Sequence, residues 1–435
     1  MFLAATGSFS EVVLGAAPAR AQASCRHRAF TGYGPLLPDP AGVIDLPRGF
    51  QYRILSREGD ALTGGGVVPS RHDGMAAFAA RSGTLLVRNH EISPEDVAED
   101  DALAVPAFGE FTYDPAGVGG TTTLLISNTR ELVRHHVSLA GTVDNCAGGP
   151  SPWSTWLSCE ETVEVLERPH GYVFEVDPRR GGNPDPIVAM GRFQHEAVSF
   201  DRRGRAYLTE DASGPFGCIY RFSPSRPLEG AGSLHAGGVL EAMAVSGVGA
   251  DLSVVSDPGS VLPVRWLPVP DANPLGASTS VREQVIALGA TPIKKAEGTW
   301  LGADGDIWFV SSYAGGPLAE NAADVTAAAH AGQIWRYSPR RELIELVAAF
   351  PIGSVFDGPD NITATPYGFA LACTDGEDAQ YLVGINDSGE AFPFGLNVLS
   401  GSEFAGATFS PDGRTLFVNI QGPPGLTLAI WGPWA

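Results

Sequence analysis

The apolar positions of the chain recur in one arrangement. An acidic residue stands near the start of a segment, small or aromatic residues follow, and a glycine-centred turn leads into an apolar run that ends in polar residues. The segments with this arrangement are 72–91, 144–161, 195–211, 297–311, 360–375 and 403–420. Several of their turns are Asp-Gly or Ser-Gly, which favour a tight connection between antiparallel strands. Each segment is therefore predicted to form a two-stranded hairpin.

Six hairpins of one kind predict an all-β fold, namely a six-bladed β-propeller with inserted loops. Strand-like apolar runs between the hairpins, such as 171–176, 218–222 and 333–337, would supply the outer strands. The uneven spacing of the six segments places insertions between the blades, and radial repetition leaves no long exposed sheet edge. The alternative is that glycine-turn hairpins recur by chance, as they can in any β-rich protein.

The glycine and proline content favours many short strands, because 54 Gly and 34 Pro stand among 435 residues. We expect residues 25–435 to form a single propeller domain. Residues 1–24 resemble an export signal, with Ala21-Gln22-Ala23 as a small-x-small cleavage site. The segment lacks a positively charged start, so an alanine-rich N-terminal arm is the alternative. With an export signal, the location would be periplasmic or secreted.

Charge limits the partners that the protein can have. The 49 acidic and 28 basic residues give a formal net charge of −21, whereas a protein that binds nucleic acid or an anionic membrane carries a positive surface. No apolar run reaches membrane-spanning length. The hydrophobic fraction of 44% is enough for a large core. The five cysteines are an odd number without a Cys-x-x-Cys pair, which argues against a disulfide scaffold and a structural zinc site.

The acidic residues of the repeats suggest a metal site. The innermost strand of each propeller blade faces the central channel, so one acid per repeat would form a ring at one mouth of that channel. Strand ends at Glu91, Glu160, Asp211 and Asp375 would add a second set of carboxylates. Crowded carboxylates raise one another's pKa unless cations bind. Oxygen ligands select Ca²⁺, and a thiolate among them points to a transition metal such as iron.

Cys159 is the candidate for a sulfur ligand, because it directly precedes Glu160 and Glu161 at the end of a predicted strand. The alternative for a lone cysteine is a small buried apolar residue. His72 and His195 precede the opening acids of two repeats. They are interpreted as metal ligands or as hydrogen-bond partners that orient the ligands.

Several stretches resemble the PhoX-type alkaline phosphatases of bacteria, and together they run from about Gly49 to the C-terminus. They include 52–57, 72–78, 87–91, 119–123, 145–149, 156–162, 191–196, 359–362 and 402–413. The resemblance implies a six-bladed propeller, phosphomonoesterase activity, a cluster of Fe³⁺ and Ca²⁺ ions at the channel mouth, and export in the folded state by the twin-arginine route. Carried over motif by motif, the metal ligands would be Glu91, Cys159, Glu160, Glu196, Glu297, Asp360, Asp375 and Glu403.

The residues expected to hold phosphate depart from the family pattern at one position. The family tends to carry an arginine just before its Glu-Gly motif, where this chain has Lys294-Lys295-Ala296 ahead of Glu297-Gly298. A lysine offers a point charge in place of a two-pronged donor. Lys295, Asn89 and Arg57 are expected to neutralise phosphate charge. Their alternatives are a solvated surface lysine, an ordinary hydrogen-bonding asparagine and an arginine without a role in the site.

Taken with the resemblance, which implies hydrolysis of small phosphomonoesters, the sequence predicts a metal-dependent monomer that binds neither nucleic acid nor membranes. It contains no Gly-x-Ser-x-Gly nucleophile motif and no phosphate-binding Walker loop. One alternative is a calcium-dependent propeller lactonase or phosphotriesterase. Another is a non-catalytic propeller in which calcium is structural and one face binds a partner or a glycan. Iron bound together with calcium would separate the phosphomonoesterase from both.

Overall fold

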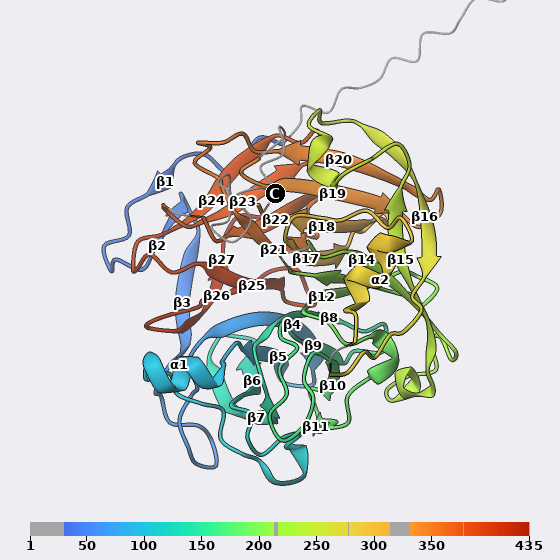
Figure 1. Cartoon of the computed structure of the whole chain (residues 1–435). Coiled ribbons are helices and arrows are strands. Elements are labelled where there is room, and N and C mark those ends of the chain that lie inside the picture. The colour runs from blue at the N-terminus through green and yellow to red at the C-terminus, as the bar shows by residue number, and fades with distance from the viewer. Residues whose placement is uncertain (1–29, 213–215, 277, 314–329, 377, 435) are drawn as a thin grey trace, which may run out of the picture.

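The computed structural model describes residues 30–212, 216–276, 278–313, 330–376 and 378–434. In these ranges the chain is built mainly of antiparallel β-strands arranged around a central axis (Figure 1). The α-helices among them are short, α1 (Pro94–Glu99) and α2 (Val281–Ala287), and a capping serine starts each one. No helix in the described ranges is long and apolar enough to span a membrane. The predicted export signal, residues 1–24, lies outside the described residues.

The strands form several sheets, and hydrogen bonds join the strands of each sheet. One four-stranded sheet has the order β4 (His72–Ala80), β5 (Gly83–His90), β6 (Gly119–Ser127), β7 (Leu132–Thr142). The next has the order β8 (Asn145–Pro150), β9 (Trp156–Glu160), β10 (Val173–Asp177), β11 (Gly181–Gly182). A six-stranded sheet has the order β21 (Pro359–Ala364), β22 (Phe369–Thr374), β23 (Tyr381–Asn386), β24 (Ala391–Asn397), β2 (Ile44–Pro47), β1 (Leu36–Leu37).

Another sheet joins the two ends of the described chain. Its order is β25 (Phe404–Phe409), β26 (Leu416–Ile420), β27 (Leu426–Trp431), β3 (Gln51–Arg57). Tyr52 of β3 stands opposite Ile430 of β27. Figure 1 shows β3, in blue, in the same sheet as the red strands from the end of the chain. This pairing links a strand near the start of the described chain to its last strand and so closes the circular arrangement.

The largest sheet has nine strands and contains two of the repeats. Its order is β12 (His195–Phe200), β13 (Ala206–Glu210), β14 (Ile219–Pro224), β15 (Gly238–Val245), β16 (Val261–Pro268), β20 (Leu343–Ala349), β19 (Gln333–Ser338), β18 (Ile307–Ser311), β17 (Ala296–Leu301). The long strand β16 pairs with β15 along one edge and with β20 along the other. It therefore joins what would otherwise be two separate four-stranded sheets.

The predicted hairpins are confirmed at all six repeats, as β4-β5, β8-β9, β12-β13, β17-β18, β21-β22 and β25-β26. The first strands of these hairpins contact one another in a closed ring, β4-β8-β12-β17-β21-β25. An all-β, propeller-like fold is thus confirmed. Six separate blades are found only in part, because β16 merges two of them into one sheet.

Each strand of this inner ring contains a β-bulge close to its start. In β4, for example, Asp73 and Gly74 together stand opposite one residue of β5, Asn89. The equivalent bulge pairs are Asp73-Gly74, Cys146-Ala147, Glu196-Ala197, Glu297-Gly298, Asp360-Asn361 and Gly406-Ala407. A bulge bends its strand and changes the direction of a side chain. The repeated bulge therefore places six equivalent residues at one mouth of the ring.

The second bulge residue is small where neighbouring strands approach closely. A Cβ added at Gly74 would lie 2.6 Å from the Cα of Ala147. A Cβ at Gly298 would lie 2.7 Å from the backbone nitrogen of Ile362. Glycine thus allows the inner strands to pack tightly beside the first bulge residues.

Candidate metal centre

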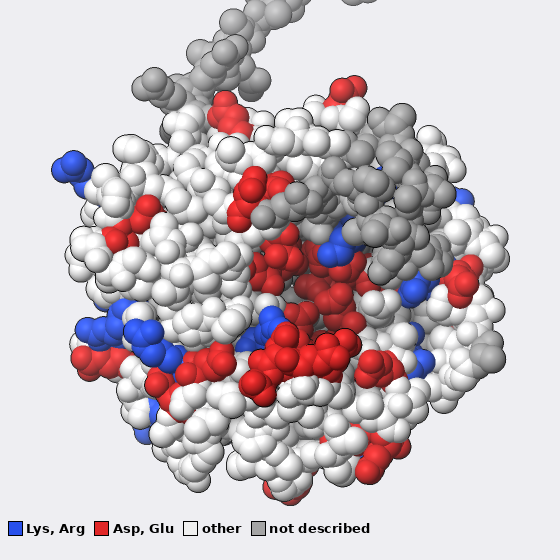
Figure 2. Space-filling model, turned by 60° about the vertical axis from the view of Figure 1, so that its left-hand side comes forward, with Lys and Arg blue, Asp and Glu red and all other residues white. Residues whose placement is uncertain are grey.

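Acidic side chains converge at the mouth where the inner strands begin. Figure 2 shows Asp and Glu side chains gathered in a hollow near the middle of one face. One set comprises the first bulge residues, Asp73, Cys146, Glu196, Glu297, Asp360 and Gly406. The other set directly follows the second strand of each hairpin and comprises Glu91, Glu161, Asp211, Ser312, Asp375 and Gln421. Each repeat therefore contributes one residue from its bulge and one from the end of its second strand, and most of these residues are acidic.

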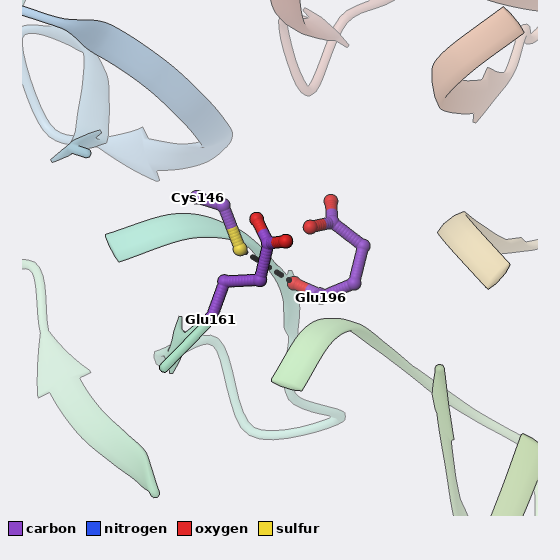
Figure 3. Close-up of side chains that lie close together, drawn as sticks. All are labelled: Cys146, Glu161 and Glu196. Carbon is purple, nitrogen blue, oxygen red and sulfur yellow. Dashed lines mark hydrogen bonds between the residues drawn. The ribbon is translucent and has the colours of Figure 1, made fainter. Parts of the chain in front are cut away.

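Within the described residues, two groups of side chains come close enough to share a cation. Cys146, Glu161 and Glu196 form one group, and Glu196, Glu297 and Asp360 form the other. In each group, one ligand atom from every member lies within 4.8 Å of the others. Figure 3 shows Glu161 and Glu196 directed toward each other beside the Cys146 sulfur. Glu196 belongs to both groups and links them.

Cys146 is held at this position by the neighbouring inner strand. Its thiol donates to the backbone oxygens of His195 at 3.3 Å and Glu196 at 3.5 Å. The side chain is buried. Burial has the largest effect on the pKa of the thiol and raises it, and the negative charges of Glu196 and Glu161 raise it further. A bound cation would lower the pKa of the thiol, because the thiolate is the form of cysteine that ligates metals.

The carboxyl groups of the centre cannot all be charged without compensation. Burial, and then neighbouring carboxylates, raise the pKa values of Glu161, Glu196 and Asp360 well above their usual range. Burial also raises the pKa of Asp211 to about 7, although Lys295 opposes the shift. Like charges in a site of low polarity have this effect. Cations bound among the side chains would compensate the negative charges and so remove one cause of the raised pKa values.

Asp73 gives a further indication that a cation belongs here. Its Oδ1 is buried and has no hydrogen-bond partner within the described part of the chain. Its Oδ2 accepts a hydrogen bond from Nε2 of Gln421 at 3.2 Å, and the same amide nitrogen donates to Glu91 at 2.6 Å. Buried polar atoms are normally satisfied. An unsatisfied carboxylate oxygen beside converging acids fits a bound hard cation.

The sixth repeat supplies its ligand atoms differently from the others. Its first bulge residue is Gly406, whose φ of +61° suits glycine. Glu403 stands just before β25, and its pKa is raised by burial and by Asp375, Asp360 and Asp73. Glu403 therefore borders the same centre from outside the bulge. Asp375, at the end of β22, is exposed at the rim.

Lys295 places a cation on the edge of the centre. Its Nζ lies 3.1 Å from Oδ2 of Asp211 and 3.2 Å from Oε1 of Glu297. The negative charge of Glu297 raises the pKa of this ammonium group, and the charge of Asp211 raises it further. The ammonium group therefore keeps its proton. The side chain is 34% exposed. Ser312 also donates to Oε1 of Glu297, at 2.7 Å.

The other two residues expected to touch phosphate lie elsewhere. Asn89 is fully buried, and its amide donates to the backbone oxygens of Cys146 and Ala147 at 3.2 and 2.6 Å. Its oxygen accepts from Trp156 and Ser158. Asn89 therefore supports β8 instead of facing the hollow. Arg57 is exposed at the end of β3, the outermost strand of its sheet.

Cys159 and Glu160 belong to neither group of converging side chains. Cys159 stands opposite the bulge of β8 and lies in an apolar cluster with Leu157 and Val173. The carboxylate of Glu160 accepts hydrogen bonds from the backbone nitrogens of Gly171 and Tyr172, and its Oε1 is 2.6 Å from Nδ1 of His170. Glu160 thus shapes a loop, whereas the next residue, Glu161, enters the centre.

The sequence contained a signal for Cys146 that the spacing of acids alone missed. Aligning the repeats on the pair formed by a ligand-type residue and a following small residue places Cys146-Ala147 beside Asp73-Gly74, Glu196-Ala197 and Glu297-Gly298. In that alignment a cysteine takes the place of an acid. The ligand roles of Glu91, Glu196, Glu297, Asp360, Asp375 and Glu403 stay predictions, and the structure places all six at this mouth.

His72 and His195 lie beside the centre without joining either group. His72 is buried between the oxygen of Pro69 and the guanidinium of Arg88. His195 stacks on Phe193, with ring centroids 3.7 Å apart, and its Nε2 is 3.0 Å from the oxygen of Gly191. Burial lowers the pKa of both rings. Both are therefore neutral residues that fix the backbone before Asp73 and Glu196.

Comparison with known proteins gives a family-level match. The family model described as alkaline phosphatase PhoX matches residues 31–424. PhoX of Pseudomonas fluorescens, solved in complex with vanadate, a transition state analogue, is 17% identical, with 93% of this chain and 98% of that chain covered and a TM-score of 0.70. No curated protein sequence matches this chain.

Other solved structures match with lower TM-scores. A calcium-binding regucalcin from Agrobacterium tumefaciens is 12% identical, with 88% of this chain and 96% of that chain covered and a TM-score of 0.45. A gluconolactonase from Xanthomonas campestris is 11% identical, with 93% and 100% covered and a TM-score of 0.44. The likeness to the Pseudomonas structure supports the propeller-like fold found here.

Proposed function

The chain belongs to the PhoX family of alkaline phosphatases and is a phosphoester hydrolase, and from that premise we propose that it cleaves small phosphomonoesters at a cluster of Fe³⁺ and Ca²⁺ ions in the mouth of its inner ring. The observation that carries the metal centre is the buried, unsatisfied Oδ1 of Asp73 beside two converging groups of ligand-type side chains. We also interpret the nine-stranded sheet as two blades joined by β16, which gives six blades in total.

The chemistry of the two groups suggests different ions. The group with a thiol, Cys146 with Glu161 and Glu196, suits iron, and the all-oxygen group of Glu196, Glu297 and Asp360 suits calcium. Asp73, Glu91, Asp375 and Glu403 would complete the ligand set. Bound metal ions would supply positive charge that stabilises the phosphoryl oxygens and the leaving oxygen. Relative to the sequence prediction, Cys146 and Glu161 replace Cys159 and Glu160.

Lys295 is the residue best placed to meet a phosphate that enters the hollow. Its ammonium group keeps its proton beside Glu297 and remains partly exposed, so it can contact an oxyanion bound next to the metal ligands. It supplies a single point charge, so we expect it to attract phosphate more than to orient it. Asp211 holds the ammonium from the other side and fixes its position.

Cys146 also bears on the alternative functions. A calcium-dependent lactonase or phosphotriesterase, or a non-catalytic calcium propeller, has no need of a thiol among its ligands. The placement of a cysteine against two glutamates supports the mixed iron and calcium centre.

A monomeric state, a periplasmic or secreted location and twin-arginine export stay predictions.

Turnover of p-nitrophenyl phosphate by the purified full chain tests this function. We expect hydrolysis when the protein contains both calcium and iron, and loss of hydrolysis after chelation. Bis(p-nitrophenyl) phosphate and a small lactone serve as competing substrates. Inactivity of fully metal-loaded protein toward the monoester, or faster turnover of either competitor, would contradict the proposal.

A further inference from the structure

A cavity of about 380 Å³ lies at the other end of the strands that carry the metal-centre residues. Pro150, Phe200 and Leu301 line it, and each ends an inner strand, β8, β12 or β17. Cys146, Glu196 and Glu297 stand four residues earlier in the same strands. At about 3.3 Å per residue, the cavity is roughly 13 Å from the metal centre. Its volume is in the range of small-molecule sites.

Most of the cavity wall is apolar and aromatic. Trp300 contributes a ring system and Leu228 an apolar side chain, whereas Phe200 lines the cavity with only 3% of its surface exposed. The ring of Phe200 is held by Trp153, with centroids 5.8 Å apart and planes at 67°. Leu228 is 52% exposed and has a φ of +61°, a backbone conformation that leucine rarely adopts. The chain thus holds an apolar side chain in an unfavourable backbone conformation at the cavity edge.

The charged groups of the cavity wall leave one cation available. Asp201 accepts from Nε of Arg205 at 2.7 Å and from the hydroxyl of Tyr207 at 3.2 Å, so its charge is compensated. Arg202 is exposed, and its guanidinium donates to the backbone oxygen of Ala303 at 2.7 Å. None of the ion pairs among the residues that the structure describes includes Arg202. A guanidinium without an ion pair, next to an aromatic side chain, suits a flat anion.

We infer that this cavity binds a small aromatic carboxylate, with its ring against Trp300 and Leu228 and its carboxylate on Arg202. Within the described part of the chain Arg202 has no ion pair, so it can attract an anion to the cavity although the net charge of the protein is −21. The aromatic wall selects a ring over an open chain. The site is separate from the phosphatase centre, and the inference does not depend on the proposed function.

Calorimetric titration of the full, metal-loaded chain with 1-naphthoate tests the inference. Inorganic phosphate at saturating concentration is present throughout, so that the anion cannot report on the metal centre. We expect one site with a Kd below about 1 mM, as for a ligand of this size. Arg202→Gln should weaken binding about tenfold, because it removes a charge-assisted hydrogen bond. The neutral isostere 1-naphthalenemethanol should bind the wild-type protein as weakly as 1-naphthoate binds that variant.

Arg203→Gln is the matched control, because Arg203 is the exposed neighbour that does not line the cavity. It should bind 1-naphthoate as the wild type does. Leu228→Gly suits the backbone conformation and removes the apolar edge, so it should also weaken binding. Absence of saturable binding in the presence of phosphate, or equal affinities of the Arg202 and Arg203 variants, would overturn the inference. So would a dimer that buries the cavity, detected by sedimentation and dissociated by Leu228→Asp.

Discussion

Cys146 and Glu196 occupy the same position in neighbouring inner strands. Each is the first residue of the bulge in its hairpin, and the thiol of Cys146 donates to the backbone oxygen of Glu196 at 3.5 Å. The repeat that places acids at four of the other bulges, Asp73, Glu196, Glu297 and Asp360, therefore places a sulfur beside them. This relationship distinguishes the centre from a ring of carboxylates alone and underlies the metal assignment.

The close approach of inner strands beside the centre predicts a strong effect of a single methyl group. Gly74→Ala would place a Cβ 2.6 Å from the Cα of Ala147 and 2.8 Å from the oxygen of Cys146. We expect the free energy of unfolding to fall by about 2–3 kcal/mol, because backbone cannot move aside as a flexible side chain can. Urea unfolding in the presence of calcium measures this loss.

Gly249→Ala is the control for this substitution. A Cβ at Gly249 would meet nothing within 4 Å, and the residue does not have a positive φ. Its unfolding free energy should stay within about 0.5 kcal/mol of the wild type. Equal stabilities of the two variants would show that the inner strands tolerate the extra atom.

Lys295 is predicted to affect substrate affinity. Lys295→Gln removes the partly exposed ammonium between Asp211 and Glu297, so KM for p-nitrophenyl phosphate should rise about tenfold, as expected for a lost charge-assisted contact. Lys295→Arg should retain most of the affinity. Steady-state kinetics at matched metal content measures both variants.

Arg57→Gln provides the comparison, because this arginine is exposed on an outermost strand. It should leave KM and kcat unchanged. A rise in KM for Arg57→Gln, or an unchanged KM for Lys295→Gln, would contradict the assignment of the phosphate-binding cation to Lys295.

Stability without metal is predicted to depend on pH. The pKa of Asp211 is raised to about 7 from a model-peptide value near 3.8, mainly by burial. Between about pH 4 and pH 7 the folded state therefore holds more protons than the unfolded chain, so the free energy of unfolding falls as pH rises. Calcium bound to the ionised carboxylates offsets this loss. The Tm difference between calcium-loaded and chelated protein should widen from pH 5 to pH 8.

Asp211→Asn should reduce this widening, whereas substitution of the exposed Asp378 by Asn should leave it unchanged. Thermal unfolding of the three proteins at several pH values makes the comparison. A Tm difference that is constant across the range would contradict the account of the buried carboxyl groups.

The hairpins could be predicted because their signals are local. Glycine turns between short apolar runs define β4-β5 and β17-β18 without knowledge of distant contacts. The sharing of β16 between two sheets could not be predicted, because it depends on pairing between Val261 and Glu345, far apart in the chain. The closure by β3 and β27 depends in the same way on the two ends of the chain.

The candidate centre was predicted in part. The acids Glu196, Glu297 and Asp360 could be located from the repeat, and they converge in the structure. Cys159 was selected because it precedes a pair of glutamates. The bulge adds one residue to β8 opposite Cys159, so the side chain that reaches the centre belongs to Cys146 on the other strand of the hairpin. A bulge leaves only a weak trace in one sequence, the small residue after most of the ligand positions.

The most direct test of the account compares alanine substitutions of the two cysteines. Both side chains are buried in the same apolar cluster, so the loss of packing is similar. Iron and calcium content, measured by mass spectrometry, and p-nitrophenyl phosphate turnover are recorded for each variant. Cys146→Ala should lose iron and at least about 100-fold in turnover, a loss at the upper end of that caused by disturbing a metal site, while Cys159→Ala should keep both. Wild-type iron and turnover in Cys146→Ala would contradict the account.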